Sequence, residues 1–426
     1  MTGVRPTTSV LAGDRLTVRT TPIDDPEDLL AGLPVPGEPD GPGPLAWVRR
    51  GAGIIGWGEV ARVSLPAGTD RFTAGEKWVR ELFDGASVTD EVRLPGTGAV
   101  AFGSFTFDPS CEGSVLVVPR VVLGRDGVGN AWLTTIGDGA PVAAERAPLV
   151  SPGQVRWHDG SLAAPIWERA VAAAVRRIMV GDLQKVVLAR DLFATADEPI
   201  DQRVLLRRLA SRYRDCYTFA VAGLLGATPE LLIRRRGTEV SALVLAGTIP
   251  RGASPDEDAA LAAELLRSAK NTEEHAYAAA SVREILEPLC ADLTIPGRPG
   301  LLRLANVQHL GTKVNGTLAP DKRDRSALAL AGALHPTAAV GGTPTEAAIE
   351  LIRELEQMDR DRYAGPVGWI DADGNGEWGI ALRCAQVAGD RARLFAGCGI
   401  VAGSDPATEL AEAQVKFRPM QAALEP

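Results

Sequence analysis

A lysine and a glutamate stand where an acid–base reaction could use them. Lys185 opens the apolar run 185–190, which has strand composition, and alternation along a strand places it on one face with every second residue. At a solvent-exposed edge this lysine has no special role, whereas desolvation in a cleft lowers its pKa and makes it a general base. Glu230 ends a tight turn, where it is either solvated or held as a buried general acid.

Carboxylates suited to a hard metal ion gather near the C-terminus. Glu409, Glu412 and Lys416 share one face of the last expected helix, because spacings of three and four residues bring helical side chains together. The pair Glu412 and Lys416 is equally typical of a surface ion pair. Glu274 lies near the start of another helix, where a carboxylate also complements the helix dipole. Together the three glutamates would form an oxygen site of the kind that Mg²⁺ prefers.

Glycines, an arginine and a tyrosine indicate an anion-binding site. Gly397 and Gly399 lie in the run 396–401, which we expect to form a loop between a strand and the last helix, with backbone N–H groups free for an anion. Arg383 ends an apolar run, and a carboxylate bound by both arms of its guanidinium is the natural partner. Tyr363 could add a hydroxyl donor. The sequence contains neither a dinucleotide-binding fingerprint nor a P-loop.

The bulk composition narrows the class of partner. The 426 residues are 45% hydrophobic and 23% charged, with a net charge of −9, which is ordinary for a globular protein and argues against nucleic-acid or anionic-membrane partners. No apolar stretch approaches the roughly 20 residues of a membrane span, and no secretory signal opens the chain. The 5 cysteines are widely spaced and form no C-x-x-C pair, so we expect a cytoplasmic protein without a disulfide framework or zinc ribbon.

The elements that must position these residues are strands and helices in irregular alternation. The pattern predicts an α+β fold with large, mostly antiparallel sheets and helices packed outside. We expect residues 1–150 to be a sheet-rich portion and residues 151–426 to be the catalytic region, both within one folded unit. Residues 22–44 and 148–160 are expected to be a surface loop and a turn-rich joint.

Turn and cap signals divide the chain into individual elements. Helices are predicted after residue 160, from Ser254 with a break near Asn271, and from Asp405, where proline follows a capping side chain. Short strands are expected between residues 45 and 136. Further strands are predicted at residues 185–190, 217–225, 230–235, 239–245, 367–370, 378–387 and 391–396.

From about Trp167 to the C-terminus, roughly 60% of the chain, the sequence resembles the chorismate-utilising enzymes. This family comprises isochorismate, salicylate, anthranilate and aminodeoxychorismate synthases, and its fold is the expected one. The matching segments occur in the family's order. They are residues 185–190 (KVVLAR), 228–232 (TPELL), 245–248 (LAGT), 251–252 (RG), Glu274-His275, 308–310 (QHL), 363–366 (YAGP), Arg383, 396–401 (AGCGIV) and the set Glu409, Glu412 and Lys416.

The resemblance implies a role for each of these residues. Lys185 would take a proton from an attacking water, and Glu230 would protonate the departing hydroxyl. Glu274, Glu409 and Glu412 would hold Mg²⁺, which would bridge to the ring carboxylate of chorismate. The implied substrate-binding residues are Gly247, Thr248, His335, Tyr363, Arg383, Gly397, Cys398, Gly399 and Lys416.

Two features of the resemblance favour the isochorismate synthase branch. Lys185 matches a position that is a lysine in the water-adding members, and residues 334–344 contain His335-Pro336-Thr337, the form common in isochorismate synthases. The implied reaction is a Mg²⁺-dependent isomerisation of chorismate to isochorismate by water addition and loss of the ring hydroxyl. We expect a monomer without an obligate glutaminase partner, whose product feeds menaquinone, siderophore or salicylate biosynthesis.

Three alternatives stay open on the sequence. A salicylate synthase would go on to eliminate pyruvate, an aminating synthase subunit would depend on a glutaminase chain, and a non-catalytic protein would only bind a ligand. Two departures from the family's pattern bear on the site. Ala413 stands where threonine is frequent, and Cys398 replaces a usual alanine, so the packing around the metal ligands is in doubt.

Overall fold

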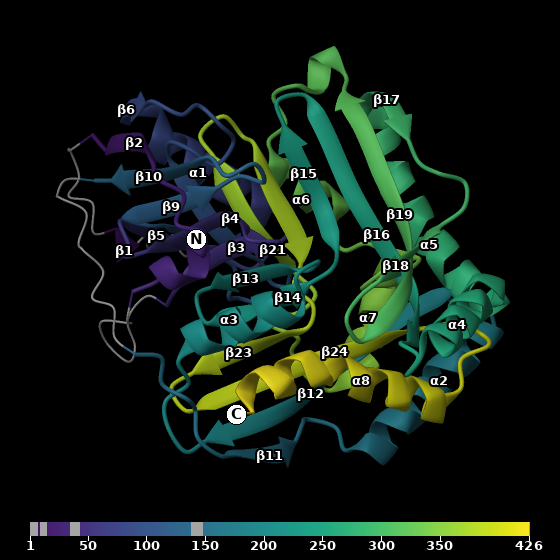
Figure 1. Cartoon of the computed structure of the whole chain (residues 1–426). Helices are drawn as coiled ribbons and strands as arrows, with labels where there is room; N and C mark the ends of the chain where they lie inside the picture. Colours follow the sequence, from purple (N-terminus) through teal and green to yellow (C-terminus); the bar gives the residue numbers. More distant parts are fainter. Residues whose placement is uncertain (1–6, 9–14, 35–42, 138–147, 426) are drawn as a thin grey trace.

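Two large sheets form the framework of the protein. The computed structural model describes residues 7–8, 15–34, 43–137 and 148–425 (Figure 1). Within these ranges, one sheet has 11 strands and the other 13, and every pairing is antiparallel except that of β2 with β6. The predicted α+β class with mostly antiparallel sheets is confirmed.

Strands from distant parts of the sequence alternate within each sheet. The 11-stranded sheet has the order β1 (Thr7–Thr8), β5 (Ala61–Ser64), β8 (Val115–Val118), β7 (Val100–Ser104), β21 (Pro366–Asp371), β22 (Gly376–Ile380), β15 (Leu231–Arg236), β16 (Glu239–Pro250), β19 (Val307–Leu318) and β17 (Cys290–Thr294), with β18 (Gly300–Arg303) also on β19. The 13-stranded sheet has the order β11 (Val155–Asp159), β12 (Lys185–Ala196), β24 (Arg391–Ile400), β23 (Cys384–Ala388), β14 (Leu224–Thr228), β13 (Tyr217–Val221), β3 (Leu45–Arg49), β4 (Ala52–Trp57), β9 (Val121–Arg125), β10 (Ala131–Ile136), β2 (Thr17–Ile23) and β6 (Ser87–Asp90), with β20 (Gly342–Thr343) on β12.

Helices pack against these sheets from outside. In Figure 1, α4 and α5 flank the 11-stranded sheet, and α8 crosses beside β24. The helices are α1 (Arg71–Asp84), α2 (Ala164–Met179), α3 (Gln202–Arg212), α4 (Pro255–Arg267), α5 (Ala269–Leu286), α6 (Ala327–Leu334), α7 (Thr345–Glu356) and α8 (Pro406–Leu424), with short 3₁₀ turns η1 (Leu29–Gly32), η2 (Glu287–Leu289) and η3 (Pro320–Lys322). Among the described residues, none of these helices combines the length and apolar character that crossing a bilayer requires.

The first 150 residues contribute strands to both sheets. β7 pairs with β21 in the 11-stranded sheet, and β3 pairs with β13 in the 13-stranded sheet. Figure 1 shows β21 lying among the strands of the N-terminal third. The two ranges that the sequence separates at about residue 150 are therefore interleaved through shared sheets.

Buried aromatic side chains pack within the 11-stranded sheet and anchor the strand that carries Lys185. Phe105 and Trp378 are fully buried and pack edge to face, with ring centroids 5.6 Å apart. Burying a phenylalanine side chain stabilises the folded state by about 1.5–3 kcal/mol. Trp167 of α2 is also fully buried, and its indole N–H donates to the Ala189 carbonyl at 3.0 Å. This contact anchors α2 to β12 close to Lys185.

The predicted helix starts are confirmed by their caps. The Ser254 hydroxyl accepts the Glu257 N–H at 3.2 Å, and the Asp405 carboxylate accepts the Thr408 N–H at 2.9 Å. The break expected near Asn271 lies at Ser268, whose hydroxyl accepts the Asn271 N–H at 3.2 Å and begins α5. These signals are local, so they could be recognised without knowledge of the fold.

Several other boundaries differ from those predicted. The expected strand 217–225 is the hairpin β13–β14, which turns at Ala222 and Gly223, both with positive φ. The expected strand 378–387 is split into β22 and β23 around Arg383, which has a φ of 48°. Positive φ is costly for residues with a side chain, which is why apolar runs through Ala222 and Arg383 were predicted to be continuous strands.

Several elements were not predicted, among them α3, α6, α7 and β19, and one predicted loop is partly ordered. Helix α1 lies in a region interpreted as strands, and β11 lies in the expected joint 148–160. The expected loop 22–44 begins with the end of β2 and contains η1, which buries Leu29 and Leu30, whereas residues 35–42 lie outside the described residues.

Candidate active site

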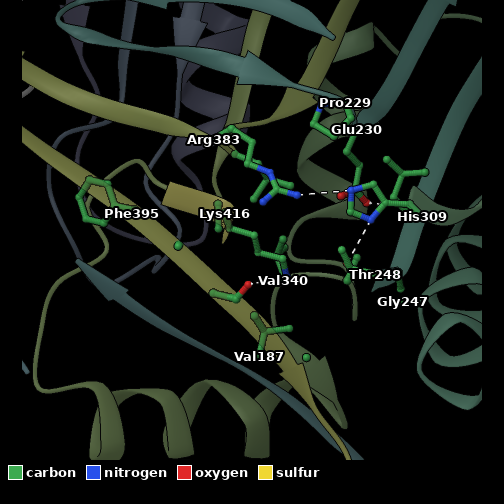
Figure 2. Close-up of a pocket in the computed structure, with 18 of the residues that line it drawn as sticks. Val187, Pro229, Glu230, Gly247, Thr248, His309, Val340, Arg383, Phe395 and Lys416 are labelled. Atoms are coloured by element: carbon green, nitrogen blue, oxygen red, sulfur yellow. Dashed lines mark hydrogen bonds between the residues drawn. The ribbon is translucent and has the colours of Figure 1, made fainter. Parts of the chain in front are cut away.

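A cavity of about 70 Å³, lined by both polar and apolar groups, opens between the two sheets (Figure 2). Strands β15, β16 and β19 approach it from the 11-stranded sheet, and β12 and β24 from the other. The cavity is lined by Val187, Pro229, Glu230, Leu245, Ala246, Gly247, Thr248, Glu274, His309, Ala339, Val340, Tyr363, Ala364, Leu382, Arg383, Phe395, Ala396, Gly397, Gly399 and Lys416.

Lys185 lies immediately behind this wall. It is the first residue of β12, its side chain is 0% exposed, and among the described residues its Nζ atom has no hydrogen-bond partner. The nearest carboxylate oxygen, Oε1 of Glu274, is 3.5 Å from Nζ, beyond good hydrogen-bond length. Burial lowers the pKa of Lys185, while Glu274 opposes that shift. The structure thus favours a neutral amine beside the cavity.

A buried ion pair holds the strand that carries Lys185. Arg360 donates to the carbonyls of Val187 at 2.7 Å and Val340 at 2.9 Å, and also to Glu356. Glu356 in turn accepts the Ala189 N–H at 2.7 Å. Because Val187 and Val340 both line the cavity, this pair fixes two parts of its wall.

Glu230 reaches the cavity from the turn between β14 and β15. Its own N–H donates to the Thr228 hydroxyl at 3.3 Å, which holds the turn. Glu230 is 4% exposed, and among the described residues the donor bonded to its carboxyl group is the Leu245 N–H, 3.5 Å from Oε1. Burial raises the pKa of Glu230 to about 8. The carboxyl group is therefore protonated near neutral pH and is able to donate a proton.

A β-bulge places two polar side chains on the facing wall. In the β16–β19 ladder, Ala246 pairs with Leu310 and Thr248 pairs with His309, so Gly247 is the extra residue. Its φ of 78° is a conformation that glycine adopts without strain. Figure 2 shows Thr248 and His309 directed toward each other at the cavity, with Arg383 on the other side of the imidazole.

The predicted glycine loop is wrong, because Gly397 and Gly399 lie within β24. They pair with Ala189 and Val187 of β12, more than 200 residues earlier in the chain. A Cβ atom on Gly399 would come within 2.0 Å of Oε1 of Glu274 and 3.0 Å of Cε of Lys185. A Cβ atom on Gly397 would lie 3.1 Å from the Tyr363 hydroxyl. The glycines therefore keep this wall open for the polar side chains.

Cationic and hydroxyl groups face the same space. Lys416 of α8 donates to the Gly397 carbonyl at 2.8 Å and pairs with Glu412 at 2.6 Å. Tyr363 stacks on Phe395 with ring centroids 5.1 Å apart. Arg383, split from the neighbouring strands by its positive φ, points into the cavity (Figure 2). These groups form a positive region suited to a dicarboxylate.

The expected metal ligands meet only in part. The carboxylate oxygens of Glu409 and Glu412 and the Cys398 sulfur lie within 4.8 Å of one another. Glu274 is not in this group and lies beside Lys185 instead. Glu409 pairs with Lys270, and burial together with Glu412 raises its pKa. Two carboxylates one helical turn apart, with a third carboxylate nearby on the cavity wall, are donors that suit Mg²⁺.

Two predicted substrate contacts are not at the cavity. Cys398 points to the other face of β24, where its thiol donates to the Glu409 carbonyl at 3.3 Å. His335 donates from Nε2 to the Phe107 carbonyl at 2.9 Å and lies against the rings of Phe72 and Phe107. Burial lowers the pKa of His335 to about 3, so it is a neutral, packed histidine. Neither residue lines the cavity, so their predicted contact with substrate stays a prediction.

The structure brings most of the predicted residues together and adds others. The predicted residues that line the cavity are Glu230, Gly247, Thr248, Glu274, Tyr363, Arg383, Gly397, Gly399 and Lys416. His309 lines it too, although only its motif and no role had been singled out. Lys270, the partner of Glu409, had no recognisable signal, because the contact joins helices 139 residues apart. His275, from the matching segment Glu274-His275, is held between the Ala246 carbonyl and the Thr312 hydroxyl.

Comparisons with known proteins agree with this geometry. A Mycobacterium tuberculosis protein, named as a candidate isochorismate synthase MenF, is 50% identical over 257 residues, covering 57% of this chain and 68% of its own. The isochorismate synthase MenF of Bacillus subtilis is 36% identical over 380 residues, covering 82% and 80%. The menaquinone-specific isochorismate synthase MenF of Escherichia coli is similar in structure, with a TM-score of 0.78, 25% identity and coverage of 99% and 96%.

The family model for the chorismate binding enzymes matches residues 144–425, which contain each of the cavity residues described above. The match spans well over half of the chain and continues through both sheets. This chain is a member of the chorismate-binding enzyme family.

Proposed function

We propose that this protein is an isochorismate synthase, which converts chorismate to isochorismate. The observation that carries the proposal is the pairing of two oppositely tuned groups at one cavity. Lys185 is buried without a hydrogen-bond partner among the described residues, which favours the free amine. Glu230 is buried with its pKa raised to about 8, which favours the acid. Such a pair provides a base and an acid at the same pH.

The cationic side of the cavity would bind the two carboxylates of chorismate. Arg383 and Lys416 supply positive charge, and Tyr363 supplies a hydroxyl at the edge of the glycine-lined wall. The bulge at Gly247 and Thr248 would lie along the ring. Fixing both carboxylates orients the ring between the base and the acid, which lowers the entropic part of the barrier.

The chemistry is an allylic exchange of one hydroxyl for another. Water adds to the ring carbon next to the carboxylate-bearing carbon, and its proton passes to the neutral amine of Lys185. The ring double bond shifts, the bond to the departing hydroxyl breaks, and Glu230 gives that oxygen a proton so that it leaves as water. Lys185 ends as an ammonium and Glu230 as a carboxylate, and proton exchange with solvent restores both.

A divalent cation is part of the proposal. Glu274, Glu409 and Glu412 would hold Mg²⁺, which would neutralise and orient the ring carboxylate of the substrate. We expect EDTA to abolish turnover and added Mg²⁺ to restore it. Isothermal titration calorimetry of the ligand-free protein with Mg²⁺ would measure the affinity directly. We expect that affinity to be weaker in the Glu412→Gln variant. Full activity after exhaustive chelation would contradict the metal site.

The test of the reaction is the product mixture from purified protein, chorismate and Mg²⁺, separated by chromatography without ammonia. We expect an equilibrium mixture of chorismate and isochorismate free of pyruvate. Salicylate with pyruvate would identify a salicylate synthase instead. A reaction that starts only when ammonia or a glutaminase is added would identify an aminating enzyme subunit.

We also propose that the isochorismate feeds menaquinone biosynthesis. The proposal is supported by the long alignment with the Bacillus subtilis MenF and the structural similarity to the menaquinone-specific enzyme of Escherichia coli. Expression of this chain should restore menaquinone in a host that lacks its own isochorismate synthase for that pathway. Failure to restore menaquinone, with an active enzyme present, would favour siderophore or salicylate biosynthesis.

A further inference from the structure

His309 stands between two cavity residues that the proposed function already uses. Its Nε2 atom lies 3.4 Å from a terminal nitrogen of Arg383, and its Nδ1 atom lies 3.1 Å from the Thr248 hydroxyl oxygen. The side chain is 5% exposed. The three residues come from β19, β16 and the segment between β22 and β23, and Figure 2 shows them as a continuous chain of contacts along one wall.

The chemistry of the arginine fixes the direction of these contacts. A guanidinium can donate hydrogen bonds but cannot accept one, so Nε2 of His309 must be the acceptor. A neutral imidazole with an accepting Nε2 carries its proton on Nδ1. With its proton on Nδ1, His309 cannot accept from the Thr248 hydroxyl, so the hydrogen of that hydroxyl is left free; the Gly247 carbonyl is a second acceptor beside the ring.

Charge and burial keep the imidazole in this neutral form. The charged groups that face it are Arg383 and Lys416, and burial together with both of them holds the pKa of His309 well below its ordinary value. The Gly247 carbonyl opposes this shift but does not outweigh it. Glu230, on the adjoining wall, is itself protonated below about pH 8.

We infer that His309 is a positioning residue. It accepts a hydrogen bond from Arg383 and carries its own proton on the nitrogen that faces Thr248. The hydrogen of the Thr248 hydroxyl is therefore available to donate to a ligand in the cavity. The ligand must then place an acceptor oxygen against Thr248, such as an ether or carboxylate oxygen. The bulge at Gly247 is what makes this possible, because it brings Thr248 directly opposite His309. The identity of that ligand as chorismate rests on the proposed function, whereas the direction of the hydrogen bonds does not.

The first test measures the tautomer in the ligand-free protein, which does not depend on turnover. Nitrogen-15 NMR of the imidazole rings distinguishes Nδ1–H, Nε2–H and imidazolium forms, and the chain has only 4 histidines. The His309 signals are those lost in His309→Gln. We expect a neutral ring protonated on Nδ1 from about pH 6 to 9. An Nε2–H ring, or a charge transition within that range, would overturn the inference.

The second test separates positioning from simple packing. Thr248→Val keeps the shape and removes the hydroxyl, so we expect kcat/KM to fall about 3- to 10-fold, mostly through KM, and Thr248→Ser to lose less. The amide of His309→Gln can accept from Arg383 and donate to Thr248, so it should retain more activity than His309→Leu. In the His309→Leu background the effect of Thr248→Val should shrink, because the hydroxyl is no longer directed.

If the variants lose turnover, their affinity for chorismate can be measured in the inactive Glu230→Gln background. Equal affinity in the Thr248→Val and Thr248→Ser versions of that variant would contradict a donor role for Thr248. If the product test instead identifies another reaction, the proposed function fails, while the NMR result still decides the inference about His309.

Discussion

Two pairs of buried ionisable side chains, Arg360 with Glu356 and Lys185 with Glu230, differ in their hydrogen bonds. The first pair bonds to β12, and Lys185 of the second pair lies on that strand. Behind the strand, Arg360 and Glu356 bond to each other and to the backbone at Val187, Ala189 and Val340. At the cavity, the amine of Lys185 has no hydrogen-bond partner among the described residues, and Glu230 has one weak donor. Both groups are almost fully buried, so burial alone does not separate a structural role from a chemical one.

The two pairs differ in how many of their polar atoms have a hydrogen-bond partner. Arg360 and the Ala189 N–H favour the carboxylate form of Glu356 and oppose the rise in its pKa that burial causes, whereas Lys185 and Glu230 have few hydrogen bonds to favour their charged forms. The satisfied pair also holds the strand on which the unsatisfied lysine lies. This comparison predicts that loss of the first group costs stability and that loss of the second costs activity.

The largest expected effect is on turnover. We expect Lys185→Ala and Glu230→Gln each to lower kcat by about 10²–10⁴-fold, because each removes one proton transfer. The folded state should not be weakened correspondingly, since neither group is well bonded. Steady-state kinetics and thermal unfolding measure both, with Lys313→Ala, an exposed lysine of β19, as the matched control. Activity within a few-fold of the parent would remove that residue from the mechanism.

Breaking the satisfied pair should mainly affect stability. Glu356→Gln or Arg360→Met leaves a buried partner unpaired, and we expect a loss of about 3–5 kcal/mol in the free energy of unfolding. Denaturant titration followed by circular dichroism measures it. Replacing both residues by apolar ones should cost less than replacing either alone. Single variants as stable as the parent would show that the pair does not hold β12.

The pH dependence tests the protonation state of Glu230. Its pKa is raised to about 8, so the acid form dominates below pH 8 and is lost as the pH rises. We expect kcat/KM to fall about tenfold per pH unit above that value. Rates measured from about pH 6 to 10 in the presence of Mg²⁺ give the profile. A profile that stays flat well beyond pH 9 would assign the proton donor to another group.

The smallest effect is expected at His335, which lies outside the cavity. His335→Gln should change kcat/KM by less than about threefold and cost about 1 kcal/mol of stability through the hydrogen bond to Phe107. Steady-state kinetics and thermal unfolding of the same preparation measure both effects. A tenfold or larger rise in KM would return His335 to the substrate site and weaken the contrast between bonded and unbonded groups.

The sequence predicted the elements whose signals are local. The caps at Ser254 and Asp405 and the face shared by Glu409, Glu412 and Lys416 follow from spacings of a few residues. The sequence indicated that Gly397 and Gly399 matter, but the predicted loop was wrong. These glycines form a strand because they pair with β12, which is distant in the sequence.

The sequence by itself determined which chemical groups are present and in what order, and that was enough to predict the family and most of the ionisable residues that line the cavity. The tertiary structure alone decided which of them meet. It placed His309 between Arg383 and Thr248, placed His335 and Cys398 outside the lining of the cavity, and left the amine of Lys185 without a hydrogen bond to any described residue. The physical reason is that protonation and hydrogen-bond satisfaction depend on neighbours in space, and here those neighbours are tens to hundreds of residues apart in the chain.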